Sequence, residues 1–134
     1  MSATDAFFDS NTLLYVLSAD QSKADTAEGL LLGGGVISVQ VLNEFALTAR
    51  RKHFLEWPEI RMALSRIRRK CKVQSLTEET HDLAVHLAER YGYRIYDASI
   101  LSAAMIARCS TLYSEDMHDG QVIENTLTIR NPFR

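Results

Sequence analysis

Short apolar runs alternate along the chain with longer segments in which apolar residues recur every three or four positions. The runs have the length of buried strands, and the longer segments have the period of amphipathic helices. We predict strands at residues 6–8, 36–38, 72–76, 111–114 and 126–129. We predict helices at residues 13–17, 24–32, 39–53, 57–71, 78–91 and 97–107. Strands and helices therefore alternate through most of the sequence.

This alternation predicts an α/β fold, a three-layer α/β/α sandwich with a mostly parallel central sheet of about four to five strands. Parallel strands need crossover connections, which the predicted helices supply. The helix at residues 97–107 is apolar nearly all round, so we expect it to be central and buried. Because the sequence contains no internal repeat and no linker-like or low-complexity segment, we expect a single domain over residues 1–134.

Composition agrees with an ordinary globular domain. The chain has 134 residues, of which 46% are hydrophobic and 24% are charged, a balance that excludes disordered and collagen-like classes. No apolar run reaches the roughly 18 residues that cross a bilayer, and residues 1–5 lack the features of a secretory signal. We therefore expect a cytoplasmic protein with no membrane partner, in which Cys71 and Cys109 are free thiols.

Four acidic residues occupy positions where ligands bind in such folds, at the carboxyl ends of parallel strands. Asp9 follows the first strand, and Asp116 comes shortly after the strand at residues 111–114. Glu44 lies in the helix after the second strand, and Asp97 opens the buried helix. Taken alone, each of them is more simply explained as a helix cap, a turn residue or a surface charge. Their shared position is what indicates a site.

The surroundings of these acids favour a metal site. Asp9 follows two phenylalanines, and Glu44 has Leu42 and Phe45 as close neighbours. Carboxylates brought together in apolar surroundings raise each other's pKa unless cations neutralise them. Mg²⁺ or Mn²⁺ suits such an all-oxygen site and can polarise a phosphate and help generate hydroxide from water. The chemistry that we predict is phosphodiester hydrolysis.

Four short motifs resemble a known family. They are Phe8-Asp9-Ser10-Asn11, Asn43-Glu44, Tyr96-Asp97-Ala98 and Ser114-Glu115-Asp116. Their order and spacing are similar to those of the PIN domain, and most of all to the VapC-type ribonuclease toxins of bacterial toxin–antitoxin pairs. The resemblance covers essentially the whole chain. Each motif is short, whereas all four in order, in a chain of this length and pattern, are considerably more specific.

The resemblance implies an acidic metal site with catalytic function, formed by Asp9, Glu44, Asp97 and Asp116. It also implies that Ser114 supplies a hydroxyl that orients the site and that Asn11 supports Asp9. The sequence departs from the family at the polar position after the first aspartate, which either Ser10 or Asn11 fills. The role of each of these two residues therefore stays open.

Asp119 is a further acidic candidate, which either binds a second metal or makes the turn into Gly120. The resemblance also implies an RNA substrate, a cognate antitoxin protein and a homodimer. We therefore expect a metal-dependent endoribonuclease in which activated water attacks an RNA phosphodiester without a covalent enzyme intermediate. The alternative is a non-catalytic PIN-like module that binds RNA or protein. A phosphatase of the aspartyl-phosphate type ranks last, because Asn11 stands where the general acid is needed.

The net charge of −2 conceals an uneven distribution. Residues 50–72 contain nine basic and two acidic residues, a net charge of +7, and the rest of the chain carries −9. On a helix, one set of these cations lies opposite the apolar stripe: Arg61, Arg68, Arg69 and Lys72. Such a cationic face suits an RNA backbone or an acidic antitoxin segment, and it is equally compatible with a solvated surface.

Overall fold

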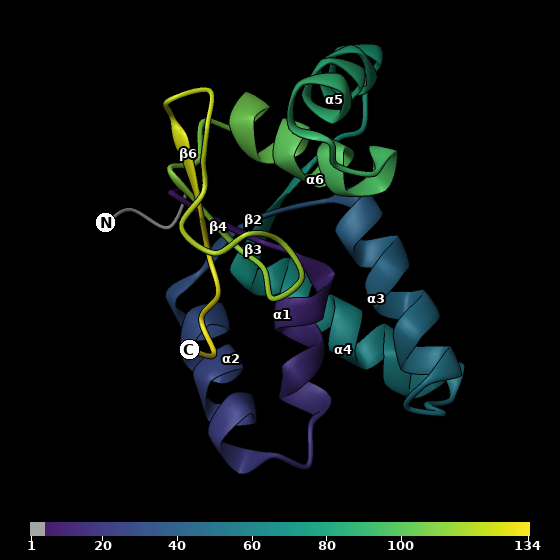
Figure 1. The fold of residues 1–134 in the computed structure, drawn as a ribbon. Helices are drawn as coiled ribbons and strands as arrows, with labels where there is room; N and C mark the ends of the chain where they lie inside the picture. Colours follow the sequence, from purple (N-terminus) through teal and green to yellow (C-terminus); the bar gives the residue numbers. More distant parts are fainter. Residues whose placement is uncertain (1–4) are drawn as a thin grey trace.

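The structure is a computed structural model that describes residues 5–134 and alternates strands with helices (Figure 1). Residues 1–4, which belong to the segment where we found no secretory signal, lie outside the described residues. The elements in chain order are β1 (Ala6–Phe8), α1 (Ser10–Leu14), the 3-10 helix η1 (Tyr15–Leu17), α2 (Gln21–Gly33), β2 (Gly35–Ser38), α3 (Val39–Arg51), α4 (Trp57–Lys70), β3 (Cys71–Gln74), α5 (Glu78–Tyr91), α6 (Ile95–Ile106), β4 (Thr111–Tyr113), β5 (Val122–Ile123) and β6 (Leu127–Arg130).

The strands form one sheet in the order β3-β2-β1-β4-β6-β5. Phe7 of β1 pairs in parallel register with Val36 of β2 on one side and with Leu112 of β4 on the other. The pairs β2–β3 and β4–β6 are also parallel, and only β5 runs antiparallel to its neighbour. The five predicted strands are all present. The prediction missed β5, because two residues are too few to show a period.

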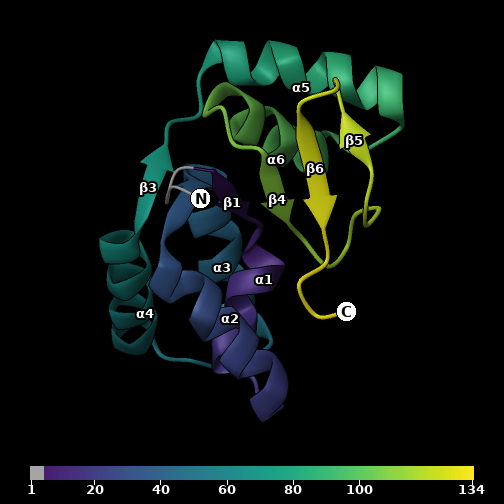
Figure 2. The ribbon, with the colours of Figure 1, turned by 90° about the vertical axis from the view of Figure 1, so that its left-hand side faces the viewer.

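Helices cover both faces of the sheet, as predicted. Figure 2 shows α5 and α6 on one side of the strands and α1 to α4 on the other. The apolar helix α6 is central, since Ile100, Leu101 and Ala104 are almost fully buried. Its first residue is Ile95, so Asp97 lies in its first turn rather than at its start.

Within residues 5–134, no helix combines the length and apolar character that spanning a membrane requires.

The junction of α4 and β3 contains one of the two cysteines and a lysine of the predicted cationic face. Cys71 and Cys109 are buried thiols that are not joined in a disulfide, and burial raises the pKa of each thiol to about 11. The predicted helical face placed Lys72 on the same helix as Arg61. That placement was wrong, because α4 ends at Lys70 and Lys72 belongs to β3. The prediction assigned the apolar Cys71 to the last turn of the helix, whereas Cys71 is the first residue of β3.

The glycine run between α2 and β2 sets how closely the first two strands approach. The backbone turns out of α2 at Gly34, whose φ of 76° is left-handed, as expected for a helix stop. A Cβ atom on Gly35 would lie 2.7 Å from Cε2 of Phe8 and 2.8 Å from the carbonyl oxygen of Ala6. Both distances are too short for a methyl group. Only glycine therefore allows β2 to lie against β1 at this point.

We predict that Gly35→Ala lowers the free energy of unfolding by about 1–3 kcal/mol, because the added methyl group overpacks the junction of β1 and β2. Gly29→Ala is the matched control, since a Cβ atom there meets no atom within 4 Å and lies inside α2. Alanine at that position should stabilise the helix by up to about 1 kcal/mol. Urea unfolding of the three proteins measures both effects, and equal stability of the two variants would contradict the close approach.

Candidate active site

Four carboxylates from distant parts of the chain lie at the ends of elements that leave the sheet. Asp9 follows β1 and is the N-cap of α1, and Glu44 lies in α3, which begins where β2 ends. Asp97 is in the first turn of α6, and Asp116 follows β4. The parallel arrangement of β1, β2 and β4 places their carboxyl ends at one edge of the sheet. This edge is where the sequence placed the site.

Asp9 is the most enclosed of the four, with 6% of its surface exposed. Its Oδ1 accepts a hydrogen bond from the backbone N–H of Ser10 at 2.7 Å. Its Oδ2 accepts from the Ser114 hydroxyl at 2.9 Å and from the Asn11 amide at 3.5 Å. Both carboxylate oxygens are thus oriented by neighbours, two of which are the side chains to which the resemblance gave supporting roles.

The structure separates the roles of Ser10 and Asn11, which the sequence left open. The Ser10 hydroxyl donates to Oε1 of Glu44 at 3.3 Å. Asn11 instead donates to Asp9 and to the Ser114 hydroxyl, and its Oδ1 accepts from the backbone N–H of Glu115 at 3.1 Å. Ser10 therefore contacts Glu44, and Asn11 connects Asp9 to the segment after β4.

Gln40 is a site residue that the sequence analysis missed. Its buried side-chain amide donates to Oε2 of Glu44 at 3.2 Å and to the backbone carbonyl of Tyr96 at 3.0 Å. Glu44 is thus held through both oxygens, and α3 is tied to the start of α6 just before Asp97. The signal for this role was the spacing, because residues four positions apart share one face of a helix.

Burial and mutual repulsion raise the pKa values of two of the carboxyl groups. The pKa of Asp9 is raised to about 7, mainly by burial and also by the charges of Glu44 and Asp97, while the hydrogen bonds from Ser114 and from the backbone of Ser10 oppose the increase. Burial also raises the pKa of Asp97, with a contribution from Asp116 that Arg94 partly offsets. Repulsion therefore links Asp9 to Glu44 and Asp97, and Asp97 to Asp116.

The donor set fits a divalent metal in an open site rather than a closed cage. Among residues 5–134, no three carboxylate, histidine or cysteine side chains converge closely enough to surround an ion. Mg²⁺ keeps several waters and is often held by one or two carboxylates together with substrate phosphates, so it does not require such a cage. The repelling oxygens around Asp9 match this chemistry, because a cation lowers the cost of keeping them ionised.

Asp119 has contacts that suit a turn. Its Oδ1 accepts a hydrogen bond from the backbone N–H of Asn131 at 2.8 Å, and the next residue, Gly120, has a left-handed φ of 87°. The contacts of Asp119 within the described residues do not join it to Asp9 or to the other three acids. Its binding of a second metal remains a prediction.

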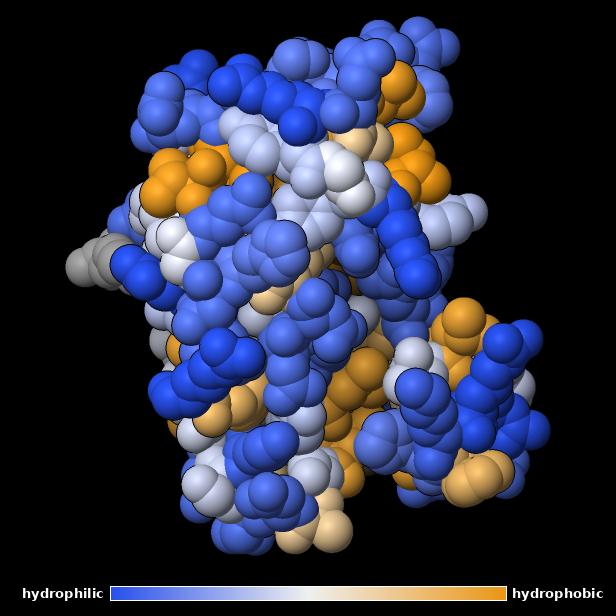
Figure 3. All heavy atoms as spheres, in the orientation of Figure 1, coloured by the Kyte–Doolittle hydropathy of each residue, from blue (hydrophilic) through white to orange (hydrophobic). Residues whose placement is uncertain are grey.

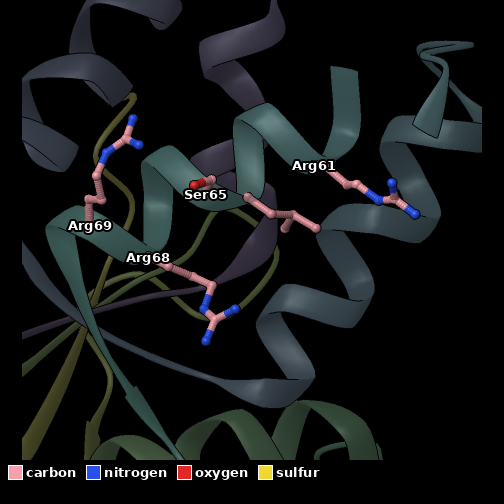
Figure 4. Close-up of a pocket in the computed structure, with 5 residues that line it drawn as sticks. Arg61, Ser65, Arg68 and Arg69 are labelled. Atoms are coloured by element: carbon pink, nitrogen blue, oxygen red, sulfur yellow. The ribbon is translucent and has the colours of Figure 1, made fainter. Parts of the chain in front are cut away.

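The predicted cationic residues are exposed, but they do not converge. Arg61, Arg68 and Arg69 project from α4 beside a cavity of about 430 Å³ that Ser65 also lines. Figure 4 shows the three guanidinium groups pointing in different directions along the helix. Lys72 is exposed on β3. None of the four site carboxylates lines this cavity.

Comparison of the sequence with models of known protein families shows the family to which the chain belongs. The pattern of the PIN domain matches residues 6–118. The chain belongs to the PIN domain family. No curated protein sequence matches it.

Three solved structures show that other proteins share the fold of this PIN domain. A toxin–antitoxin complex from Klebsiella pneumoniae has a TM-score of 0.72 at 24% identity, covering 95% of this chain and 97% of that chain. The Mycobacterium tuberculosis toxin VapC20, which cleaves the sarcin–ricin loop, has a TM-score of 0.67 at 19% identity over 83% and 89%. FitAB bound to a DNA fragment has a TM-score of 0.63 at 13% identity over 96% of each chain.

We predict that Asp9 contributes a loss of stability to the metal-free PIN domain as the pH rises from about 4 to about 7. The pKa of Asp9 rises on folding from 3.8 to about 7, so the folded state binds more protons in this range. Asp9→Asn should make the decrease shallower, whereas Asp82→Asn, at an exposed position of α5, should leave it unchanged. Urea unfolding in a chelator at several pH values measures the slope. A slope that Asp9→Asn does not alter would show that Asp9 ionises normally.

Proposed function

We propose that this PIN domain is a metal-dependent endoribonuclease and the toxin of a type II toxin–antitoxin pair that acts in the cytoplasm. Two of its structural neighbours support this proposal, a toxin–antitoxin complex and a toxin that cleaves the sarcin–ricin loop. The observation that carries it is the buried carboxylate of Asp9, oriented through both oxygens and facing the negative charges of Glu44 and Asp97. Such an arrangement is costly unless a cation neutralises it.

The proposed site residues divide the work between holding a cation and moving a proton. Asp9, Glu44, Asp97 and Asp116 are the proposed ligands of Mg²⁺ or Mn²⁺. When bound, such an ion would polarise the scissile phosphate and lower the pKa of water. Ser114 and Asn11 fix the orientation of Asp9. Glu44, which accepts hydrogen bonds from Ser10 and Gln40, is in addition the carboxylate that we propose takes up the proton of the attacking water.

An antitoxin partner is part of this proposal. The neighbouring structures include a toxin–antitoxin complex and FitAB on DNA. Four large apolar side chains are at least half exposed around the connection from α3 to α4: Leu47, Phe54, Trp57 and Met62. Exposed apolar side chains of this size often belong to interaction surfaces. We assign this region and the arginines of α4 to antitoxin binding, and we propose that the protein is a homodimer.

We predict that the purified protein cleaves single-stranded RNA in the presence of Mg²⁺ or Mn²⁺ and that Asp9→Asn reduces the rate at least about a hundredfold. The same ions should stabilise the parent against unfolding, by about 2.7 kcal/mol at a hundred times the Kd, and should not stabilise the variant. Asp82→Asn is the control, because it makes the same chemical change on an exposed helix.

The outcomes of this experiment separate the two functions considered. Cleavage by Asp9→Asn at the rate of the parent contradicts the proposal. A parent that binds RNA but neither cleaves it nor gains stability from metal is the non-catalytic module. Asp119→Asn extends the test, since lost metal stabilisation would assign this residue to a second metal, and unchanged activity would assign it to the turn.

A further inference from the structure

A cleft of about 300 Å³ opens directly beside the acidic site. One wall comes from α1 and η1, with Leu14 and Tyr15, and the opposite wall comes from the end of α3, with Lys52 and His53. Two carboxylates, Glu115 and Asp116, border the same cleft, and Glu115 is paired with Lys23 and with the Tyr15 hydroxyl. Figure 3 shows this face of the molecule hollowed between the part that contains α1 and the part that contains α3 and α4, with apolar residues at its floor.

The cleft is continuous with the proposed catalytic residues. Asn11, which donates to Asp9, lines it together with Asp116. The cleft therefore borders the acidic site directly. The cavity beside Arg61 and Arg69 on α4 has no such contact with the acidic site.

The two basic groups of the cleft are available for a ligand. Within residues 5–134, the side chains of Lys52 and His53 have no hydrogen-bond or ion-pair partner. Nearby cations are already occupied, because Lys23 pairs with Glu115 and Arg50 with Glu56, each at 3.8 Å. A phosphate that enters the cleft would meet the two groups without breaking an existing contact.

The wall opposite Lys52 is rigid and aromatic. The Tyr15 hydroxyl donates to the two oxygens of Glu115 at 2.7 and 2.9 Å, and the Tyr15 ring packs against Phe133 with centroids 4.3 Å apart. Lys23 Nζ lies 4.9 Å from the centroid of the same ring, so Phe133 and Lys23 already contact Tyr15, and Leu14 lines the cleft beside it. Aromatic and apolar walls of this kind are typical of sites that receive single bases of an unpaired RNA strand.

We propose that this cleft binds the nucleotide next to the scissile phosphate of RNA, with Lys52 and His53 holding its phosphate and with Leu14 and Tyr15 receiving its sugar and base. The proposal rests on the endoribonuclease function proposed above and makes Lys52 and His53 substrate-positioning residues. It places them, rather than the arginines of α4, next to the reacting group. Cations at this point offset the repulsion between the RNA backbone and the acidic site.

The first test compares Lys52→Ala and His53→Gln with Arg51→Ala in the full chain. Arg51 is exposed one position from Lys52, does not line the cleft and carries the same charge. With Mg²⁺ and a short single-stranded RNA, we expect Lys52→Ala and His53→Gln each to raise KM about tenfold and to change kcat less than twofold. Arg51→Ala should change neither constant.

The second test measures binding without cleavage, in the Asp9→Asn background. Lys52→Ala should lower the slope of log Kd against log salt concentration by about 0.7, the value for one lost phosphate contact on a single strand. Arg51→Ala should retain the parental slope. Fluorescence anisotropy of the labelled RNA gives both Kd and slope, and a polyglutamate peptide serves as the protein-like competitor.

Four outcomes overturn the proposal. If the parent cleaves RNA and Lys52→Ala retains the parental KM and slope, the cleft has no role although the nuclease function stands. If Lys52→Ala and Arg51→Ala change KM and the salt dependence of Kd equally, RNA is attracted by the overall positive charge of this region and not by the cleft. If Lys52→Ala loses polyglutamate binding and keeps the RNA binding of the parent, the cleft binds an acidic protein segment instead of RNA. A parent that neither binds nor cleaves RNA removes the nuclease function and this proposal together.

Discussion

A carboxylate buried where the first strand meets the first helix constrains the whole of this PIN domain. Asp9 directly follows β1, a buried strand that lies between β2 and β4, and only 6% of its surface is exposed. Its charge must therefore be met within the protein. Ser114 and Asn11 supply hydrogen bonds, and Glu44 and Asp97 add repulsion that a cation would offset. The local structure of the ends of β1 and β4 follows from this requirement.

The sheet explains how residues so distant in sequence meet. Parallel pairing of β1 with both β2 and β4 aligns three carboxyl ends, and each chain segment that leaves this edge brings polar side chains with it. The pairing of β1 with β2 depends on the close approach at Gly35. The packing of these strands therefore also determines where the acids that follow them lie. The metal site, if its ligands are those proposed, is a product of the topology and not of any single motif.

Much of this was predictable from sequence, because it depends on local pattern. The apolar runs gave five of the six strands, and the acids after the strands gave the edge at which the site lies. Contacts that depend on packing were not predictable. Gln40 looked like any polar helix residue until the structure showed its amide between Glu44 and the Tyr96 carbonyl. Lys52 was counted only as part of a basic segment, and His53 was not singled out, since no pattern shows which side chains border a cleft.

The side-chain amide of Gln40 connects α3 to α6 beside the acidic residues. It donates to a carboxylate on α3 and to a carbonyl at the start of α6, and both distances are close to those of ordinary hydrogen bonds. Gln40 and Glu44 both belong to α3, so the bond to the Tyr96 carbonyl is the one that crosses between the two helices. The same amide group therefore anchors Glu44 and fastens the beginning of α6 to α3, so that one side chain both orients an acid and joins two helices.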